Sequence, residues 1–312
     1  MRNNRKIVMV FFVMIAFYAH SQTKWTECRI SNAFSPGNDI CSIQFDKDNN
    51  MWVGTWNGIY KFGERQWEQV GPANAFIHDF YIDKQNVKWI GLWGGGLYRS
   101  DDDKHWTQIT DIKPAGCIFA INGDRNGNVW VGDWNCGVYS FINGRWNSYK
   151  KDEINLGDST VTSISSDSKN NIWFGTYHGL TVYNESGRTK LYNKTNSKLP
   201  DNDVYSLCAD SKNGIWIGTT NGLARFNGKD WLIYKKEDSC LPSNLILCIA
   251  EDQKGFIWAG TDKGVVFFNG KNWTTYSIEN SPLVDNRVQT ITVHQDRIYI
   301  GTSKGISIVE YD

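Results

Sequence analysis

The 312-residue sequence lacks an excess of charge of either sign and contains little proline. Its 33 Lys and Arg residues balance 33 Asp and Glu residues, and only 6 residues are Pro. A nucleic-acid-binding surface needs clustered basic residues to neutralise phosphates, and no basic run follows the first six residues. We therefore expect no nucleic-acid partner. An apolar fraction of 40 % with 14 % aromatic residues is enough for a packed core, which excludes a disordered chain.

Long apolar runs are also absent, except at the N-terminus. There, basic residues precede a 13-residue apolar run from Ile7 to Ala19, well short of the roughly 20 residues that a membrane-spanning helix needs. This pattern predicts a signal peptide at residues 1–21, cleaved after Ser21, and a mature domain at residues 22–312. We expect a monomer in the periplasm or the extracellular space, with no membrane insertion after signal cleavage.

Patterns typical of cofactor or metal sites are missing as well. The chain has no CxxC pair and no zinc-type spacing among its histidines, and its Asp-started turns, such as the one at Asp46, lack the acidic twelfth residue of a calcium loop. Their recurrence favours capping of a hairpin by the Asp side chain. The sequence therefore predicts no cofactor, no metal ligand and no catalytic residue that a local motif would reveal.

What the sequence does contain is one segment repeated seven times. The segments read WVGTWNGIY from Trp52, WIGLWGGGLY from Trp89, WVGDWNCGVY from Trp130, WFGTYHGLTVY from Trp173, WIGTTNGLARF from Trp216, WAGTDKGVVFF from Trp258 and YIGTSKGISIV from Tyr299. Their mean spacing of about 41 residues fits a four-stranded propeller blade. Asn-Gly pairs such as Asn143-Gly144 supply tight hairpin turns, and no helical period follows residue 21. These observations predict an all-β, seven-bladed β-propeller.

The position of Trp25 predicts how the ring closes. Five blades have a second Trp on the expected outer strand, but the chain ends at Asp312, before blade seven reaches that strand. Trp25 precedes Trp52 by 27 residues, the same interval that separates an outer-strand Trp from the next repeat elsewhere, as between Trp146 and Trp173. We therefore expect an N-terminal strand around Trp25 to complete blade seven and to remove its exposed edge.

Two repeats identify a family resemblance. The stretches DSKNGIWIGTTNGL from Asp210 and DQKGFIWAGTDKGV from Asp252 resemble the two-component regulator propeller repeat, and the NSKLPDNDVYSL stretch from Asn196 resembles the loop that precedes each blade in that family. The resemblance covers about residues 25 to 312. It implies the periplasmic sensing part of membrane receptors that detect glycan fragments. The sequence contains no transmembrane helix, kinase or following β-sandwich, so signalling within one polypeptide is not expected.

The turn between the second and third strands breaks the symmetry of the ring. Blades one to four carry aromatic residues there, whereas blades five to seven carry Thr220, Asp262 and Ser303. In closed propellers these turns frame one mouth of the central channel, where aromatic rings can bind the faces of sugars. His78 and Phe119 occupy equivalent inner-strand positions that we expect to line the same mouth. The predicted ligand-binding residues are Trp56, Trp93, Trp134, Tyr177, His78, Phe119 and His178.

Three functional hypotheses follow. The first is an exported, non-catalytic, sensor-like propeller that binds a carbohydrate fragment or another small ligand over this aromatic arc. The second is a scaffold that uses the same arc to bind a partner protein. The third is a lyase or hydrolase in which His78 or His178 transfers a proton. A purely structural alternative is that the aromatic rings of the turns pack against adjacent loops.

Among the cysteines, Cys117 and Cys136 are the one pair expected to form a disulfide, because both lie near one end of the same blade.

Overall fold

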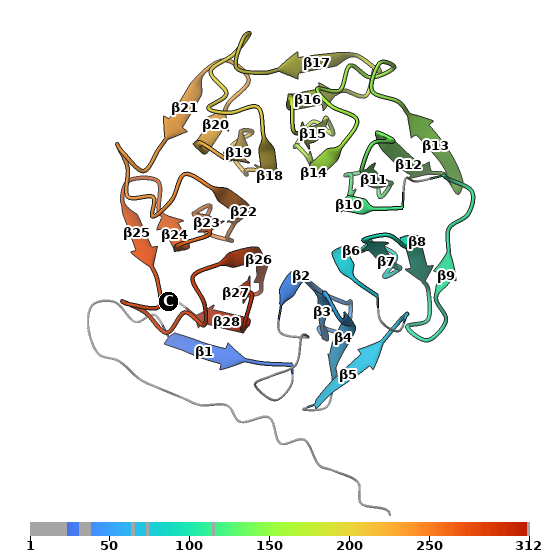
Figure 1. Cartoon of the computed structure of the whole chain (residues 1–312), viewed down its shortest axis with the longest axis horizontal. Helices are drawn as coiled ribbons and strands as arrows, with labels where there is room; N and C mark the ends of the chain where they lie inside the picture. The colour runs from blue at the N-terminus through green and yellow to red at the C-terminus, as the bar shows by residue number, and fades with distance from the viewer. Residues whose placement is uncertain (1–23, 31–38, 64–65, 73–74, 114–115, 311–312) are drawn as a thin grey trace, which may run out of the picture.

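A computed structural model of the chain describes residues 24–30, 39–63, 66–72, 75–113 and 116–310. The predicted signal peptide at residues 1–21 lies outside these ranges. The described residues form seven four-stranded antiparallel sheets arranged as blades around one axis (Figure 1). They contain no helix, and hence none long and apolar enough to cross a bilayer. The prediction of an all-β, seven-bladed propeller is confirmed.

Each blade has its innermost strand at the axis. These strands are β2 (Ile40–Phe45), β6 (Ile77–Ile82), β10 (Ile118–Gly123), β14 (Val161–Ser166), β18 (Val204–Ala209), β22 (Ile246–Glu251) and β26 (Val288–His294). The second strands are β3 (Met51–Thr55), β7 (Lys88–Leu92), β11 (Val129–Asp133), β15 (Ile172–Thr176), β19 (Ile215–Thr219), β23 (Ile257–Thr261) and β27 (Arg297–Thr302).

The third and outer strands complete the blades. The third strands are β4 (Gly58–Gly63), β8 (Gly96–Ser100), β12 (Val138–Ile142), β16 (Gly179–Tyr183), β20 (Gly222–Phe226), β24 (Gly264–Phe268) and β28 (Gly305–Glu310). The outer strands are β5 (Gln66–Val70), β9 (Thr107–Gln108), β13 (Arg145–Tyr149), β17 (Thr189–Tyr192), β21 (Trp231–Tyr234), β25 (Trp273–Tyr276) and, in blade 7, β1 (Lys24–Cys28).

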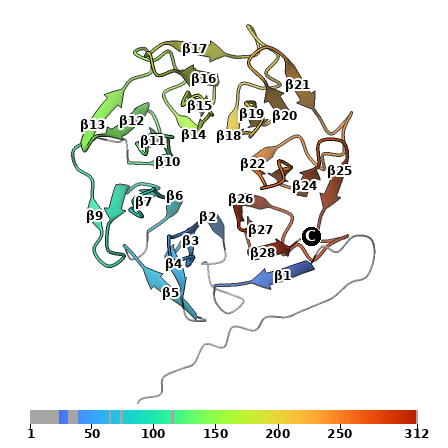
Figure 2. The same cartoon turned by 180° about the vertical axis from the view of Figure 1, so that it is seen from behind.

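Strand β1 closes the ring as predicted. It pairs antiparallel with β28 from Lys24 opposite Glu310 to Cys28 opposite Ile306 (Figures 1 and 2). The Trp25 ring lies edge-on to Tyr276 of blade 6, with 5.3 Å between ring centroids. The third strand of blade 7 is therefore not left as an exposed edge.

The repeated Trp-x-Gly sequence explains how neighbouring blades pack. The Gly of each second strand lies against the first residue of the next blade's innermost strand, which is always Ile or Val. A Cβ placed on Gly54 would lie 2.8 Å from Ile77, and one on Gly301 would lie 2.7 Å from Ile40, so blade 7 packs on blade 1 by the same contact. A larger residue would push the blades apart, because these interfaces are packed at van der Waals distance.

The repeated Trp is fixed by the Asp-started turn of its own blade. In blade 1 the Asp46 carboxylate accepts hydrogen bonds from the backbone N–H groups of Asp48 and Asn50, at 3.0 and 2.9 Å. Its other oxygen accepts the indole N–H of Trp52 at 2.9 Å. Burial opposes ionisation of Asp46, but the bonds from Trp52 and Asn50 hold its pKa below the usual value. The predicted hairpin capping is confirmed, and the Asp also anchors a core ring.

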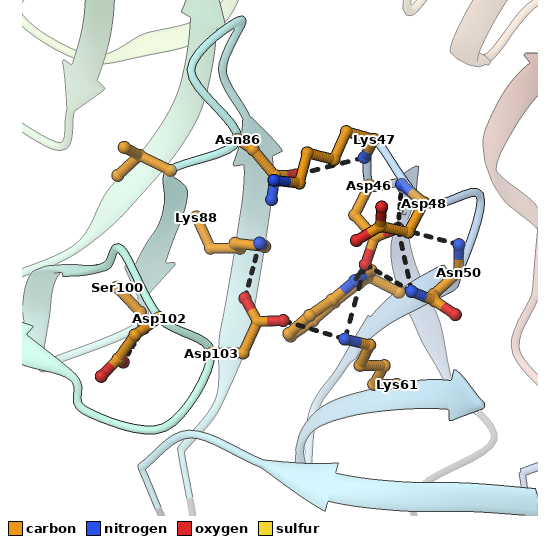
Figure 3. Close-up of polar contacts among 12 residues, drawn as sticks. Asp46, Lys47, Asp48, Asn50, Lys61, Asn86, Lys88, Ser100, Asp102 and Asp103 are labelled. Carbon is orange, nitrogen blue, oxygen red and sulfur yellow. Dashed lines mark hydrogen bonds and ion pairs between the residues drawn. The ribbon is translucent and has the colours of Figure 1, made fainter.

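A buried charge network joins blades 1 and 2 (Figure 3). The Lys88 ammonium lies 2.5 Å from Asp103 Oδ1, and the second Asp103 oxygen lies 2.8 Å from the Lys61 ammonium. Lys61 also lies 3.5 Å from Asp46. Only 1 % of the Lys88 side chain is exposed, and both ammonium groups lie over the Trp52 ring, within 5.3 Å of its centroid. The other second strands begin with Met, Val, Ile or, in blade 7, an exposed Arg, so this network is specific to one blade interface.

Candidate functional site

A β-bulge recurs at the second residue of every innermost strand. The pairing with the second strand shifts register there, so one residue per blade stands out of the ladder at the face that carries the turns between second and third strands. We call this the turn face. Bulges redirect a side chain away from the regular pleat. The seven bulge residues are Cys41, His78, Phe119, Thr162, Tyr205, Leu247 and Gln289.

Two bulge residues and two turn residues form one cluster of rings. The cluster consists of His78, Phe119, Trp93 and Trp134, from blades 2 and 3. The His78 and Phe119 rings are stacked with centroids 4.4 Å apart and planes 17° apart. The centroid of the Trp93 ring lies 5.5 Å from that of Phe119 and 5.2 Å from that of Trp134, and the Phe119 and Trp134 centroids are 5.8 Å apart. We call these four residues the aromatic cluster. The structure thus brings together four of the seven residues expected at the site.

The cluster has a buried base and an exposed rim. Phe119 is 8 % exposed, whereas Trp93 and Trp134 are 49 % and 38 % exposed. The two indoles are fixed at their backbones, because the Trp93 N–H donates to the Phe76 carbonyl and the Trp134 N–H donates to the Cys117 carbonyl, both at 3.0 Å. The cluster therefore presents rings that are held in place before any ligand arrives.

His78 is a neutral ring within this stack. Its Nδ1 lies 3.1 Å from the Phe119 carbonyl oxygen, which can only accept, so Nδ1 carries the hydrogen. Burial lowers the pKa of His78 below its usual value, although the bond to the carbonyl opposes this shift. The bond crosses from blade 2 to blade 3, so His78 also joins the two blades that support the cluster.

Asp79 forms a second connection between these blades. Its carboxylate accepts the Phe80 N–H at 2.8 Å and, across the interface, the Ile121 N–H at 2.7 Å. Burial raises the pKa of Asp79 to about 7, against the lowering effect of these hydrogen bonds. The corresponding residue in the other blades is Ser, Ala, Cys or Thr, so a carboxyl group at this position is specific to the blade that carries His78 and Trp93.

The turns of blades 2 and 3 differ from those of the other blades. In blades 1 and 4–7 a Thr ends the second strand, and its hydroxyl donates to the carbonyl of the Gly that begins the third strand, as Thr55 does to Gly58 at 2.9 Å. Leu92 and Asp133 replace this Thr in blades 2 and 3, and both turns are longer. The longer turns are the ones that carry Trp93 and Trp134.

Trp56 and Tyr177 do not join the cluster. Trp56 is 55 % exposed, and within the described ranges its ring stacks on none of the four cluster rings. The Tyr177 ring instead lies edge-on to Tyr205, the bulge residue of blade 5, at 6.1 Å. Tyr205 is not among the residues predicted from the sequence. Aligning the seven innermost strands on their first Ile or Val would have placed it with His78 and Phe119.

His178 is paired with a loop carboxylate. Its Nδ1 lies 3.0 Å from Asp158 Oδ2, and the Asp158 carboxylate also accepts the Thr160 N–H at 2.8 Å. The same arrangement recurs in blade 7, where Asp285 contacts Lys304, at 2.5 Å, and accepts a backbone N–H two residues further on. A pairing that recurs with Lys in place of His is a structural connection between loop and turn, and it does not single out His178 for proton transfer.

The expected disulfide is not formed. Cys117 is buried and pairs through its backbone with Trp93, whereas Cys136 lies in the turn that carries Trp134, two residues after it. No disulfide occurs among the described cysteines.

The repeats match a known family. Residues 35–57, 155–178, 198–221 and 240–263 match the model of the two component regulator propeller. These segments contain the innermost strand and the turn-face turn of blades 1, 4, 5 and 6. Blades 2 and 3, which carry the aromatic cluster, are not matched, and neither is blade 7. No curated protein sequence matches the chain significantly.

Solved structures share the fold. The extracellular domain of the hybrid two component system BT3049 from B. thetaiotaomicron superposes with a TM-score of 0.81 at 22 % identity, covering 92 % of this chain and 41 % of that one. An inactive virginiamycin B lyase from Staphylococcus aureus with quinupristin superposes with a TM-score of 0.76 at 14 % identity, covering 93 % and 100 %. PorZ of Porphyromonas gingivalis, a surface component of a secretion system, superposes with a TM-score of 0.68 at 16 % identity, covering 91 % and 48 %.

The chain spans about two fifths of the length of the BT3049 domain. At these identities the likeness concerns the fold alone, because one propeller architecture serves many functions. The repeat match and the seven closed blades agree with each other and with the sequence resemblance. The chain is a seven-bladed β-propeller, and segments in four of its blades match the two component regulator propeller.

Proposed function

We infer that the protein is an exported, non-catalytic propeller that binds a carbohydrate fragment on its aromatic cluster, as a sensor domain does. The observation that carries this proposal is the combination of exposure and rigidity at Trp93 and Trp134. Both indoles are substantially exposed, yet they are packed on Phe119, and the His78 ring stacks on both Phe119 and Trp93.

Holding such rings in water is unfavourable unless a ligand covers them. Exposed apolar surface costs about 25 cal/mol per Å², so a protein gains nothing in stability from presenting two fixed indoles to solvent. The C–H face of a sugar ring covers an indole by apolar contact, and its hydroxyl groups remain free for polar neighbours. Asn135 follows Trp134 directly, is exposed and supplies such a polar group.

The position of the cluster in the ring supports a specialised role. The repeat match includes blades 1, 4, 5 and 6, and both blades that form the cluster are among the three that it leaves out. Their turns are longer and lack the capping Thr, so this part of the ring departs from what the blade fold alone requires. Blades that diverge together at one point of a symmetric ring are expected where a ligand binds.

Export is the second part of the proposal. The sequence predicts a signal peptide at residues 1–21, and the structural neighbour from BT3049 is an extracellular domain. We place the mature chain in the periplasm or outside the cell, where carbohydrate fragments reach it. The lyase or hydrolase alternative gains no support from His178, because its pairing with Asp158 recurs as Lys304 with Asp285.

A calorimetric titration of residues 22–312 with xylo-, malto-, cello- and chito-oligosaccharides tests the proposal. Trp93→Ala/Trp134→Ala should weaken binding more than about tenfold, that is, by more than about 1.4 kcal/mol. Trp56→Ala is the matched control, since it removes an exposed Trp from the equivalent turn of blade 1 outside the cluster. Binding by the double variant equal to that of wild type, with both proteins folded by circular dichroism, would refute the proposal.

A partner protein is the second candidate function. Trp56 and Phe76 are each 55 % exposed on the turn face beside blade 2, which adds apolar surface beyond the four cluster rings. Such groups of exposed aromatic residues are typical of protein interfaces. The titration separates the two functions, because a protein that binds none of the four sugar series would favour the partner.

A further inference from the structure

A cleft of about 670 Å³ lies on blade 3, outward from the aromatic cluster. This volume is within the range of small-ligand sites, roughly 300–1,000 Å³. Its walls come from the third and outer strands of the blade and from the two loops that flank them. Tyr139 and Trp146 contribute rings, and Asn135, Asn147, Ser148 and Ser159 contribute polar groups. We call it the blade-3 cleft.

The walls of this cleft are held together by hydrogen bonds. The Tyr139 hydroxyl donates to the Lys113 carbonyl at 2.9 Å, which fixes one loop to the third strand. The Gly137 N–H donates to the Ser159 carbonyl at 2.9 Å, which fixes the other loop to the turn. Trp146 packs against Trp89 with 5.9 Å between ring centroids. The cleft is therefore a feature of the packed fold rather than a gap between unconnected loops.

The lining groups suit a hydroxyl-rich, uncharged ligand. Three lysines and two aspartates line the cleft, namely Lys113, Lys150, Lys151, Asp111 and Asp152, and within the described ranges no ion pair involves any of them. Charges of both signs, with exposed amide and hydroxyl groups, supply donors and acceptors in similar number. A sugar hydroxyl uses both, whereas an ion of one sign would meet repulsion from part of the lining.

One turn connects the cleft to the aromatic cluster. Trp134 belongs to the cluster, and the next two residues, Asn135 and Cys136, line the cleft. The loop that precedes β10 also connects the two sites, because its residues Asp111 to Lys113 line the cleft and its Cys117 pairs with Trp93 of the cluster. A ligand chain that covers Trp134 and continues outward over this turn enters the cleft.

We propose that the blade-3 cleft is a second subsite, so that the ligand is a neutral oligosaccharide longer than a disaccharide. One end stacks on Trp93 and Trp134, and later units occupy the cleft over Tyr139 and Ser148, which are neighbours on β12 and β13. This proposal rests on the proposed function, since it uses the aromatic cluster as the first subsite. The second subsite specifies the ligand as a neutral oligosaccharide and the direction in which it extends, outward from the aromatic cluster over blade 3.

The test compares affinity against chain length. Wild-type protein is titrated by calorimetry with members of one to six units from the four neutral oligosaccharide series. Ser148→Trp fills the cleft at an exposed position on β13, where a large residue suits a strand. Gln69→Trp is the matched control, because Gln69 pairs with Tyr60 in blade 1 as Ser148 pairs with Tyr139 in blade 3.

Affinity of the wild type should rise about tenfold or more from two to four units, and Ser148→Trp should abolish that gain while binding the disaccharide normally. Gln69→Trp should behave as wild type. An unchanged gain in Ser148→Trp would overturn the second subsite alone. Undiminished disaccharide binding in Trp93→Ala/Trp134→Ala would overturn the first subsite, and with it the proposed function. A wild type that binds no member of any series would overturn both.

Discussion

The Lys88–Asp103 pair allows a sharp prediction about the interface between blades 1 and 2. Replacing Asp103 with Gly removes the carboxylate, and Gly suits the backbone there because residue 103 has a φ of 67°. The Lys88 ammonium, 1 % exposed, then stays buried without its partner at 2.5 Å. Leaving one charge of a buried pair costs about 3–5 kcal/mol. We therefore expect Asp103→Gly to reduce the free energy of unfolding by about this amount.

The reverse substitution should cost much less. Lys88→Met removes the buried ammonium and keeps an apolar chain of similar length against Trp52. Asp103 is then not stranded, because it is 28 % exposed and keeps the Lys61 ammonium at 2.8 Å. Replacing a buried charge by a well-packed apolar residue is often close to neutral, so we expect a loss of about 1 kcal/mol or less.

Equilibrium unfolding in guanidinium chloride, followed by tryptophan fluorescence, measures both variants and the double variant Lys88→Met/Asp103→Gly. With no buried ammonium left, the double variant should be more stable than Asp103→Gly alone. If the free energy of unfolding falls with denaturant concentration at the same slope in every variant, the extrapolated free energies can be compared directly. The reasoning fails if Asp103→Gly costs no more than Lys88→Met, because the burial of an uncompensated Lys88 charge would then have no measurable effect.

Two further predictions concern the ends of the ring and its pH response. A chain without residues 1–28 lacks β1, so β28 becomes an open edge. This shortened chain should oligomerise, as measured by size-exclusion chromatography with light scattering, and a peptide of residues 24–30 should restore the monomer. A stable monomer without the peptide would contradict the prediction. Burial raises the pKa of Asp79 from 3.8 to about 7, so the folded protein holds this proton more tightly than the unfolded chain does. As pH rises from about 4 to 7, wild type should therefore lose stability relative to Asp79→Asn, by roughly 4 kcal/mol at most. Above pH 7 no further loss is expected. Parallel stability curves for the two proteins over that range would rule the titration out.

The fold was predictable because its determinants repeat. The Trp-x-Gly sequence specifies both a core ring and the space into which the next blade inserts Ile or Val, as at Gly54 and Ile77. The 27-residue interval from Trp25 to Trp52 placed the closing strand correctly, since each outer strand leads into the next blade by a loop of similar length.

The site was only partly predictable. The turn aromatics were visible as a break in symmetry, and His78 and Phe119 were found from their offsets. The β-bulge that brings them next to Trp93 and Trp134 is a backbone feature that no particular residue type marks in the sequence. The same bulge places Tyr205 in blade 5, which is why Tyr205 was not predicted. The blade-3 cleft was also not visible, because its lining comes from two loops that vary in length between blades.

The closure of blade 7 by β1 has a consequence for how the chain reaches its native state. Lys24 and Glu310 lie 286 positions apart in the sequence, so the pairing that completes the ring is the most distant strand pairing among the described residues. Contacts of that separation slow folding, because a long loop must be ordered before they form. Blades 1 to 6 can assemble in order as the chain emerges, but the last blade waits for both ends to meet. Until that encounter, two blade faces and the edge of β28 remain open to other chains, so this step is where chaperones or dilution should raise the yield of native protein most.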